Sequence, residues 1–249
     1  MNHFLSALTL LTVLPVKTAP IKEGDTWQGG RALAFYPLVG LVIGALIVAG
    51  RFLFLLAFPP LVAAVLVIGL WAILTGGLHL DGFTDACDAL FVPVSRERRL
   101  TILHDVHLGA FGAAGLALLL LTKSSATASV TSYWPIALAP VLGRWAMVCA
   151  AIYPLARQEG MAAMFRAGFT RRELVIATTI CVVICLPAGV FGLLALVAAF
   201  ATATLVAKLA MSRIGGLTGD MYGSICETVE TVVLLLGTVA LPVMYLAGR

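Results

Sequence analysis

Residues 33–57 read LAFYPLVGLVIGALIVAGRFLFLLA, and Arg51 is the one charged residue in this run. A helix of about 20 mostly apolar residues is long enough to cross the hydrocarbon core of a bilayer. In lipid every backbone N–H and C=O group needs a partner inside the protein, and an α-helix supplies these partners within its own segment. The run therefore predicts a membrane-spanning α-helix.

Similar apolar runs continue along the chain. They lie near residues 60–78, 108–123, 134–154, 174–190, 191–210 and 229–247. The stretch from Glu173 to Ala210 is too long for a single span, and Pro187 with Gly189 offers a turn that would split it into a hairpin. We therefore expect an all-α fold: a polytopic integral membrane bundle of about seven transmembrane helices, in which residues 1–249 form a single domain.

The first residues, Met1 to Val16, form a shorter apolar run. They contain neither a basic segment before the run nor a small-residue cleavage site, so we do not expect a removable signal peptide. The run is also too short to span a bilayer. We expect a short interfacial or re-entrant helix that stops near Pro15.

The composition supports lipid rather than water as the solvent. Of the 249 residues, 61% are hydrophobic and 11% are charged, whereas soluble domains contain about 25% charged residues. The net charge of +4 is spread over segment ends and not gathered in one basic tract, which argues against nucleic-acid binding. The five cysteines form no CxxC pair, so we expect neither a disulfide nor a zinc site.

Seven spans would place most positive charges on one side of the membrane. Twelve of the 16 Lys and Arg residues fall there: Lys17, Lys22, Arg31, Arg96, Arg98, Arg99, Arg157, Arg166, Arg171, Arg172, Lys208 and Arg213. Arg51, Lys123 and Arg249 fall on the opposite side, and Arg144 lies in mid-span. Because loops rich in Lys and Arg stay in the cytoplasm, we expect the loaded face to be the cytoplasmic side of a bacterial membrane.

The densest group of acidic residues lies after the second apolar run, in the sequence GGLHLDGFTDACD at 76–88. Asp81, Asp85 and Asp88 are spaced i, i+4 and i+7, so a helix would place them on one face. Neighbouring carboxylates repel one another unless a cation lies between them. Oxygen ligands favour a hard ion such as Mg²⁺, which binds a few carboxylates together with substrate phosphates. The alternative is a solvated acidic loop at a helix end.

A second acidic group follows the glycine-rich sequence GGLTGDMYG at 215–223, and comprises Asp220, Glu227 and Glu230. The glycines would let backbone N–H groups approach an anion, and a helix beginning near Asp220 would add its positive end. Carboxylates inside a span are rare and usually functional. This segment could hold a phosphate and a metal ion together, or its glycines could serve close packing alone.

Other polar residues lie between or beside these groups. Asp105 is a candidate metal ligand or helix N-cap, and His104 or His107 could accept a proton or contact a phosphate, although an interfacial histidine is more often simply solvated. Arg144 stands in an apolar run, where an unpaired charge costs a few kcal/mol, so it should face an acidic partner or a phosphate. Lys208 flanks the glycine-rich segment and could meet a diphosphate.

Together these features indicate transfer of a phosphate-bearing group from a nucleotide-activated donor at the cytoplasmic membrane face. A CDP-alcohol phosphatidyltransferase would use similar carboxylates, but its signature has an Ala-Arg pair after the second motif position and more widely spaced late aspartates, which the Asp81 segment lacks. A cation transporter also uses Asp and Glu near helix breaks. Against a transporter, the acids cluster on one face and the sequence shows no visible inverted repeat.

Several blocks of sequence resemble the cobalamin synthase family, the adenosylcobinamide-GDP ribazoletransferases. They are Leu14-Pro15-Val16, Arg31 through Gly44, His79 to Asp88, the pattern Asp105…Gly109…Gly112, and Thr218 to Glu230. Together they run nearly from end to end of the chain. The two acidic blocks, in this order and spacing, are the most specific part of the resemblance.

The resemblance implies a membrane enzyme with one catalytic domain that completes the nucleotide loop of coenzyme B12. Such an enzyme, with Mg²⁺, transfers the cobinamide-phosphate group of adenosylcobinamide-GDP to the 5′-hydroxyl of α-ribazole, or to α-ribazole 5′-phosphate. GMP leaves, and adenosylcobalamin or its 5′-phosphate is formed. The expected partners are these two substrates and membrane lipid, without nucleic acid, and a homo-oligomer stays an open alternative.

The residue patterns and the resemblance together give a candidate site. The expected metal ligands are Asp81, Asp85, Asp88, Asp220, Glu227 and Glu230. The expected catalytic residues are Asp85, Asp105 and His104, and the expected substrate-binding residues are Arg31, Arg144, Lys208, Gly216 and Gly219. One departure concerns His104 and His107, where the family usually has basic residues. A phosphate contact there would be weaker and would depend on pH.

Overall fold

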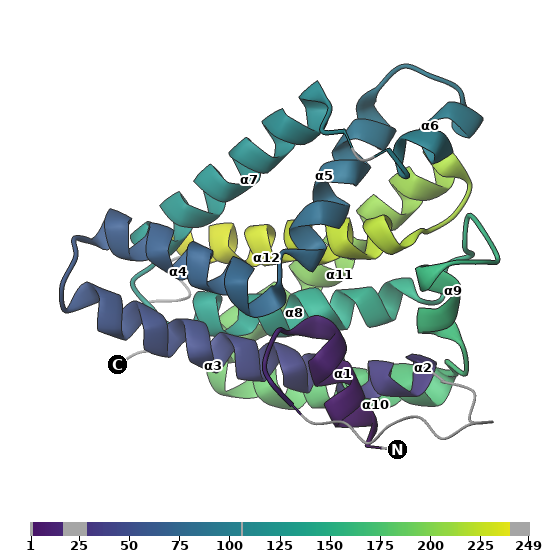
Figure 1. Cartoon of the computed structure of the whole chain (residues 1–249). Coiled ribbons are helices and arrows are strands. Elements are labelled where there is room, and N and C mark those ends of the chain that lie inside the picture. The colour runs from purple at the N-terminus through teal and green to yellow at the C-terminus, as the bar shows by residue number, and fades with distance from the viewer. Residues whose placement is uncertain (1, 17–28, 106, 240–249) are drawn as a thin grey trace.

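The computed structural model describes residues 2–16, 29–105 and 107–239, and these residues confirm the all-α class (Figure 1). The helices are α1 (His3–Leu11), α2 (Gly29–Ala32), α3 (Tyr36–Leu55), α4 (Pro60–Thr75), α5 (Leu78–Phe91), α6 (Arg96–Ile102), α7 (Ala110–Ser129), α8 (Trp134–Ala150), α9 (Met161–Arg166), α10 (Arg171–Cys185), α11 (Gly189–Ile214) and α12 (Gly219–Thr238). Within this part of the chain, extended pairing is limited to one isolated bridge between Leu155 and Leu217.

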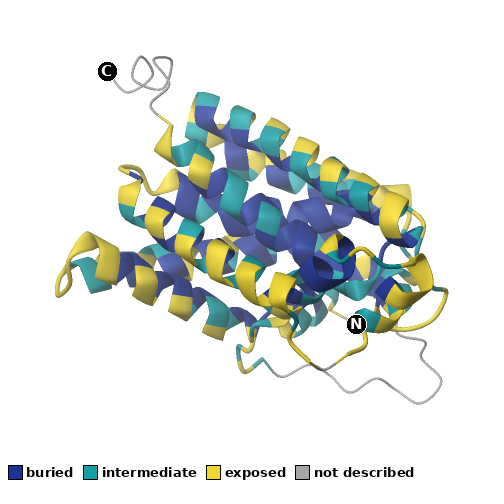
Figure 2. Cartoon of the chain, turned by 90° about the horizontal axis from the view of Figure 1, so that it is seen from above, coloured by how far each residue is buried: buried dark blue, intermediate teal, exposed yellow. Residues whose placement is uncertain are grey.

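The core of the bundle lies around α8, in which every residue from Leu138 to Ala150 is buried. Helices α3, α11 and α12 pack against it, and Figure 2 shows the buried residues gathered in the middle of the bundle. Small residues allow the closest approach: a Cβ atom at Gly40 of α3 would lie 2.4 Å from the Pro140 carbonyl oxygen. Such small-residue contacts are typical of helix packing in membranes.

The long apolar stretch after Glu173 is divided as predicted. A short 3₁₀ turn, Leu186–Ala188, separates α10 from α11, and Gly189 takes φ +58° and ψ −132°, outside the helical region. Trp145 of α8 contacts both arms: its indole N–H donates to Thr178 of α10, and its ring lies 6.4 Å from that of Phe200 in α11. Thr178 and Phe200 lie at similar distances along the chain on either side of the turn, and both are next to Trp145. Helices α10 and α11 therefore run back alongside each other as a hairpin.

A sharp bend joins α4 to α5. Gly76 and Gly77 have φ values of +62° and +70°, which favour glycine because it has no side chain. The two helices consequently meet at a bend of 96°. The acidic segment that begins with Asp81 is therefore helical, as predicted, but it leaves the direction of the preceding apolar helix.

Length and apolar composition mark three segments as long enough to cross a membrane: Gly29–Leu55, Ala110–Ser129 and Arg171–Ile214, which includes the hairpin. The bent pair Pro60–Thr75 and Leu78–Phe91 would make a fourth if it were one span. These long apolar helices indicate an integral membrane protein. The count of seven spans stays a prediction.

Several predicted boundaries are wrong. Helix α12 begins at Gly219, close to the predicted helix start near Asp220, and therefore extends further towards the N-terminus than the apolar run expected at 229–247; residues 240–249 lie outside the described part. Helix α7 continues to Ser129, so Lys123 is not at a span end. Its side chain is only 3% exposed and therefore faces protein, not the opposite membrane surface. At the N-terminus, α1 already ends at Leu11.

The two ends of the bundle differ. In Figure 1 the turn between α3 and α4 lies at one end, whereas α2, α6 and α9 gather at the other. Arginines hold this second end together: buried Arg99 donates to the Ala89 and Leu90 carbonyl oxygens at the end of α5, and Arg96 donates to the Ile214 carbonyl at the end of α11. These two cations therefore satisfy carbonyl groups at helix C-termini.

Candidate functional site

The site is built where the first turns of α5 and α12 cross. A Cβ atom at Gly82 of α5 would lie 2.9 Å from the Cα atom of Asp220, and one at Gly223 of α12 would lie 3.1 Å from the His79 carbonyl oxygen. Any larger residue would push the helices apart. The two glycines therefore bring Asp81 and Asp220, from separate acidic groups, to one place.

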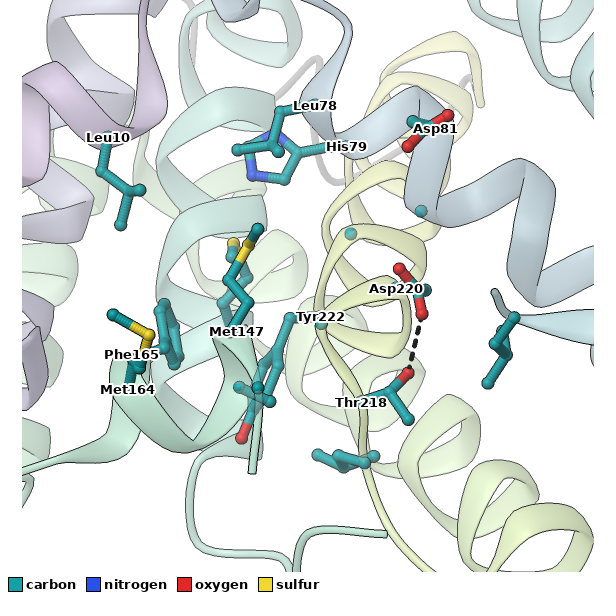
Figure 3. A pocket seen from close by; sticks show the side chains of 18 of the residues that line it. Leu10, Leu78, His79, Asp81, Met147, Met164, Phe165, Thr218, Asp220 and Tyr222 are labelled. Carbon is teal, nitrogen blue, oxygen red and sulfur yellow. Dashed lines mark hydrogen bonds between the residues drawn. The ribbon is translucent and has the colours of Figure 1, made fainter. Parts of the chain in front are cut away.

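A cavity of about 890 Å³ opens beside this crossing. Asp81 and Asp220 line one part of it, and Figure 3 shows Met147 and Phe165 on the other side. The cavity lies at the end of the bundle that carries α9 and the loop after α8. We call Asp81, Asp85 and Asp220 the acidic site; Asp85 lies one helical turn beyond Asp81.

The acidic site has no cationic partner in the described part of the chain, since none of its three carboxylates takes part in an ion pair there. Partial burial, together with Asp81, Asp220 and Asp88, raises the pKa of Asp85 to about 6. The Thr218 hydroxyl donates a hydrogen bond to the Asp220 carboxylate at 3.1 Å. A cation bound at this cavity would reduce the repulsion between the uncompensated carboxylates.

The geometry limits what metal could bind here. Among the described residues, no three Asp, Glu, His or Cys side chains converge to form a metal site by themselves. Mg²⁺ commonly uses only one or two carboxylates, with waters and substrate phosphates completing its octahedron. The acidic site fits such an ion better than it fits Zn²⁺ or Ca²⁺, which take more ligands from the protein.

Asp88 has other partners. Its two carboxylate oxygens accept hydrogen bonds from the backbone N–H groups of Gly109 and Gly112, each at 2.8 Å, at the start of α7. Substitution at either glycine would bring a Cβ atom within 2.3 Å of this carboxylate. Asp88 therefore caps a helix, as charged side chains at helix N-termini do.

Glu227 and Glu230 also lie apart from the acidic site. The Lys123 ammonium donates to Glu227 at 2.7 Å and to Glu230 at 2.6 Å, and the Arg144 guanidinium donates to the second Glu230 oxygen. All four side chains are at most 4% exposed. We call these residues the buried ion cluster. Its two positive and two negative charges balance, and this pairing offsets the energetic cost of burying charged groups inside a membrane bundle.

His79 connects the buried ion cluster to the cavity. Its Nδ1 atom lies 3.3 Å from an Arg144 nitrogen. Because a guanidinium can only donate, Nδ1 accepts and the ring hydrogen sits on Nε2. The Nε2 atom is buried on the cavity wall without a hydrogen-bond partner in the described chain. Arg144 thus has the acidic partner that the sequence predicted, and it orients a histidine toward the cavity.

Only some of the remaining predicted site residues line the cavity. His104 and Gly219 line the cavity, as expected for site residues. Asp105 does not: it is exposed and pairs with the His107 ring at 2.6 Å, and this hydrogen bond lowers the pKa of Asp105. Arg31 and Lys208 are exposed side chains that do not line the cavity, and Gly216 packs against the backbone of Leu155 and Ala156.

Sequence reasoning missed an aromatic part of the site. Tyr36, Met147, Phe165 and Tyr222 also line the cavity, and we call them the aromatic end. They come from α3, α8, α9 and α12. No local pattern joins residues so far apart in sequence. Lys123 was missed for a different reason: a lysine in an apolar run, with two intramembrane glutamates elsewhere, was itself the signal of a buried ion pair.

A bundle of long apolar helices, with carboxylates that lack an ion-pair partner among the described residues at one end of a cavity, defines the class as a membrane-embedded enzyme. The model of the CobS family, cobalamin-5-phosphate synthase, matches residues 3–238. The chain therefore belongs to this family and is a transferase of cobalamin biosynthesis. The ribazoletransferase activity that the sequence predicted is confirmed by this match and by the relatives that follow.

Three similar proteins are each named adenosylcobinamide-GDP ribazoletransferase. The protein of Roseiflexus sp. is 35% identical over 97% of this chain and 91% of its own length. That of Deinococcus radiodurans is 41% identical over 92% of this chain and 82% of its own length. That of Syntrophobacter fumaroxidans is 37% identical over 94% and 96%. No solved structure matches the chain.

Proposed function

We propose that the acidic site and the cavity beside it form the centre where adenosylcobinamide-GDP meets α-ribazole or its 5′-phosphate. The observation that carries this proposal is the crossing of α5 and α12, which places Asp81 and Asp220 on one cavity wall without an ion-pair partner among the described residues. In the reaction, a ribose hydroxyl attacks the phosphorus nearer cobinamide, the bond from that phosphorus to the bridging oxygen breaks, and GMP leaves with the oxygen.

The attacking oxygen is a secondary ribose hydroxyl, and not the 5′-hydroxyl expected from the sequence. The family description names a product that carries a phosphate at position 5. An acceptor with a phosphate on its 5′ oxygen cannot also use that oxygen to attack. One secondary hydroxyl can serve both α-ribazole and its 5′-phosphate, so one mechanism suffices for both acceptors.

Asp81 and Asp220, with Asp85 one turn away, are the residues that would hold Mg²⁺ together with the diphosphate. When bound, Mg²⁺ would offset the negative charge that develops on the departing GMP. Asp88 is left out of this set because its oxygens already accept hydrogen bonds from backbone N–H groups at the start of α7. Glu227 and Glu230 are left out because they already accept hydrogen bonds from Lys123.

His104 is the candidate proton acceptor. It lines the same cavity as Asp81 and Asp220. An imidazole there could take the proton from the attacking hydroxyl. Asp105, which the sequence also predicts as catalytic, lies outside the cavity and pairs with His107.

The seven-span topology is also a proposal. It counts α3, α4, α7, α8, α10, α11 and α12, with α10 and α11 separated by the hairpin turn. Helix α12 carries two glutamates but qualifies because Lys123 and Arg144 neutralise them inside the bundle. This topology places the cavity at the positively charged face of a single domain, which would be the cytoplasmic side of the cytoplasmic membrane.

The test is GMP release by the detergent-purified protein from adenosylcobinamide-GDP, α-ribazole and Mg²⁺. We expect turnover to need the metal and to fall at least about 100-fold in Asp81→Asn and Asp85→Asn, because both remove charge from the acidic site. Asp105→Asn makes the same chemical change outside the cavity and should keep most of the activity. Wild-type protein without release under any divalent ion would overturn the proposal.

A further inference from the structure

The cavity has two chemically different ends. Figure 3 shows Asp81 and Asp220 on one side and Met147, Met164 and Phe165 on the other. The acidic part accounts for a metal and a diphosphate. The aromatic end has no role in that chemistry, yet its residues line the same cavity.

The aromatic end is built for a flat ring. The ring centroids of Tyr36 and Phe165 lie 5.5 Å apart, and those of Phe165 and Tyr222 lie 4.9 Å apart. All three rings are at least nine-tenths buried, and the thioether of Met147 is buried beside the same cavity. Aromatic faces and edges and a methionine sulfur stabilise a planar aromatic ligand.

Two buried hydroxyls at this end have no partner. Tyr36 Oη and Tyr222 Oη make no hydrogen bond within the described chain, although Tyr36 is fully buried and Tyr222 only 3% exposed. Buried phenol hydroxyls are normally hydrogen-bonded. Both residues line the cavity, so a ligand in it could supply the missing acceptors.

Size limits how much of the larger substrate this space can hold. Small-molecule sites measure about 300–1,000 Å³, and this cavity of about 890 Å³ has room for a nucleoside and a diphosphate. Adenosylcobinamide-GDP combines a corrin macrocycle, an adenosyl group and a nucleotide, so its corrin must remain outside. The aromatic end is then free for a part of the other substrate.

We propose that the aromatic end is the base-binding subsite of the acceptor, and that it holds a flat, largely apolar heteroaromatic base of the benzimidazole type. The base lies against Phe165 and Met147, and the Tyr36 and Tyr222 hydroxyls donate to its free ring nitrogen and to the ribose. The ribose then points toward the acidic site, where its hydroxyl attacks. This inference rests on the ribazole transfer proposed above, and it makes these residues specificity determinants for the lower ligand.

The test uses Tyr222→Phe and Tyr36→Phe in the full-length protein. Because each hydroxyl is unpaired within the described chain, its removal should leave the melting temperature unchanged or slightly higher. Loss of a hydrogen bond to the acceptor should raise the KM for α-ribazole about five-fold, while the KM for adenosylcobinamide-GDP stays as in the wild type. Phe165→Leu should raise the KM for α-ribazole further by removing the stacked ring.

Tyr133→Phe is the matched control, since Tyr133 is exposed and does not line this cavity. A second measurement is the Kd of α-ribazole by equilibrium dialysis without adenosylcobinamide-GDP, which needs no turnover. If Tyr222→Phe, Tyr36→Phe and Phe165→Leu bind α-ribazole like the wild type, the subsite is elsewhere. A KM change confined to adenosylcobinamide-GDP would assign the aromatic end to guanine instead. Wild-type protein that binds α-ribazole but releases no GMP would count against the reaction alone.

Discussion

Asp220 and Glu227 lie on the same helix, about two turns apart, and their carboxylates have opposite surroundings. Asp220 faces a cavity, where it neighbours Asp81 and has no cation beside it in the described chain. Glu227 is buried and receives a hydrogen bond from Lys123 at 2.7 Å. The comparison teaches that an acidic residue in a membrane bundle is a candidate for catalysis when its charge is left unpaired, and a structural element when another helix neutralises it.

The largest expected effect is the loss of one member of the buried ion cluster. Glu230→Gln leaves Lys123 and Arg144 with one carboxylate between them, so one positive charge stays buried without compensation. We expect the free energy of unfolding to fall by about 3–5 kcal/mol, as for other broken buried pairs. Thermal unfolding in detergent measures this loss.

Two further variants show whether charge is the cause. Lys123→Met in the Glu230→Gln background restores a net charge of zero and should recover part of the lost stability. Glu97→Gln, on an exposed part of α6, should change the melting temperature little. Equal stability of Glu230→Gln and the wild type would show that the cluster is not a structural element.

The acidic site should respond to metal where the buried ion cluster does not. Mg²⁺ with adenosylcobinamide-GDP, in the absence of acceptor, should stabilise the wild type by about 2.7 kcal/mol at one hundred times the Kd. Asp220→Asn should lose this gain, whereas Glu227→Gln should keep it despite a lower starting stability. The measurement is the melting temperature with Mg²⁺ and after EDTA. A metal-induced gain that survives in Asp220→Asn would place the ion elsewhere.

The distance between α5 and α12 can be changed without touching any charge. Gly82→Ala would place a methyl group 2.9 Å from the Asp220 Cα atom and force the helices apart. We expect GMP release to fall about ten-fold, because the carboxylates lose their mutual position. Gly69→Ala is the matched control: this glycine of α4 has nothing within 4 Å of an added Cβ atom, so activity should be unchanged. Equal activity of both variants would show that the crossing does not position the site.

The sequence predicted the all-α fold, the hairpin turn at Gly189 and a helix starting near Asp220, because each follows from a local pattern of apolar, proline and glycine residues. It also predicted that Asp81 and Asp220 act together. The contact itself depends on how closely Gly82 lets two helices approach, which is a property of packing and not of spacing.

Other features lay beyond any local pattern. The aromatic end draws on four separate helices, so only the folded chain shows that Tyr36 and Tyr222 face one space. The sequence predicts Glu227 and Glu230 as metal ligands because carboxylates inside a span are usually functional, and it places Lys123 on the opposite side of the membrane. Once α7 is seen to continue past Lys123, the lysine and both glutamates become one cluster.

Asp88 gives the sharpest test of the comparison. It follows Asp81 and Asp85 in the same acidic segment, but its carboxylate caps a helix. Both of its oxygens accept backbone N–H groups at the start of α7. Asp88→Asn keeps one acceptor and loses the other, so we expect about 1 kcal/mol of stability to be lost, as for other caps. GMP release at saturating Mg²⁺ should stay within about three-fold of the wild type, since a cap of this strength positions α7 and not the diphosphate. The opposite outcome is a variant that keeps its melting temperature but needs at least about ten-fold more Mg²⁺, a change of about 1.4 kcal/mol in metal binding. Asp88 would then be a metal ligand, and it would contact the backbone of α7 only when no metal is bound.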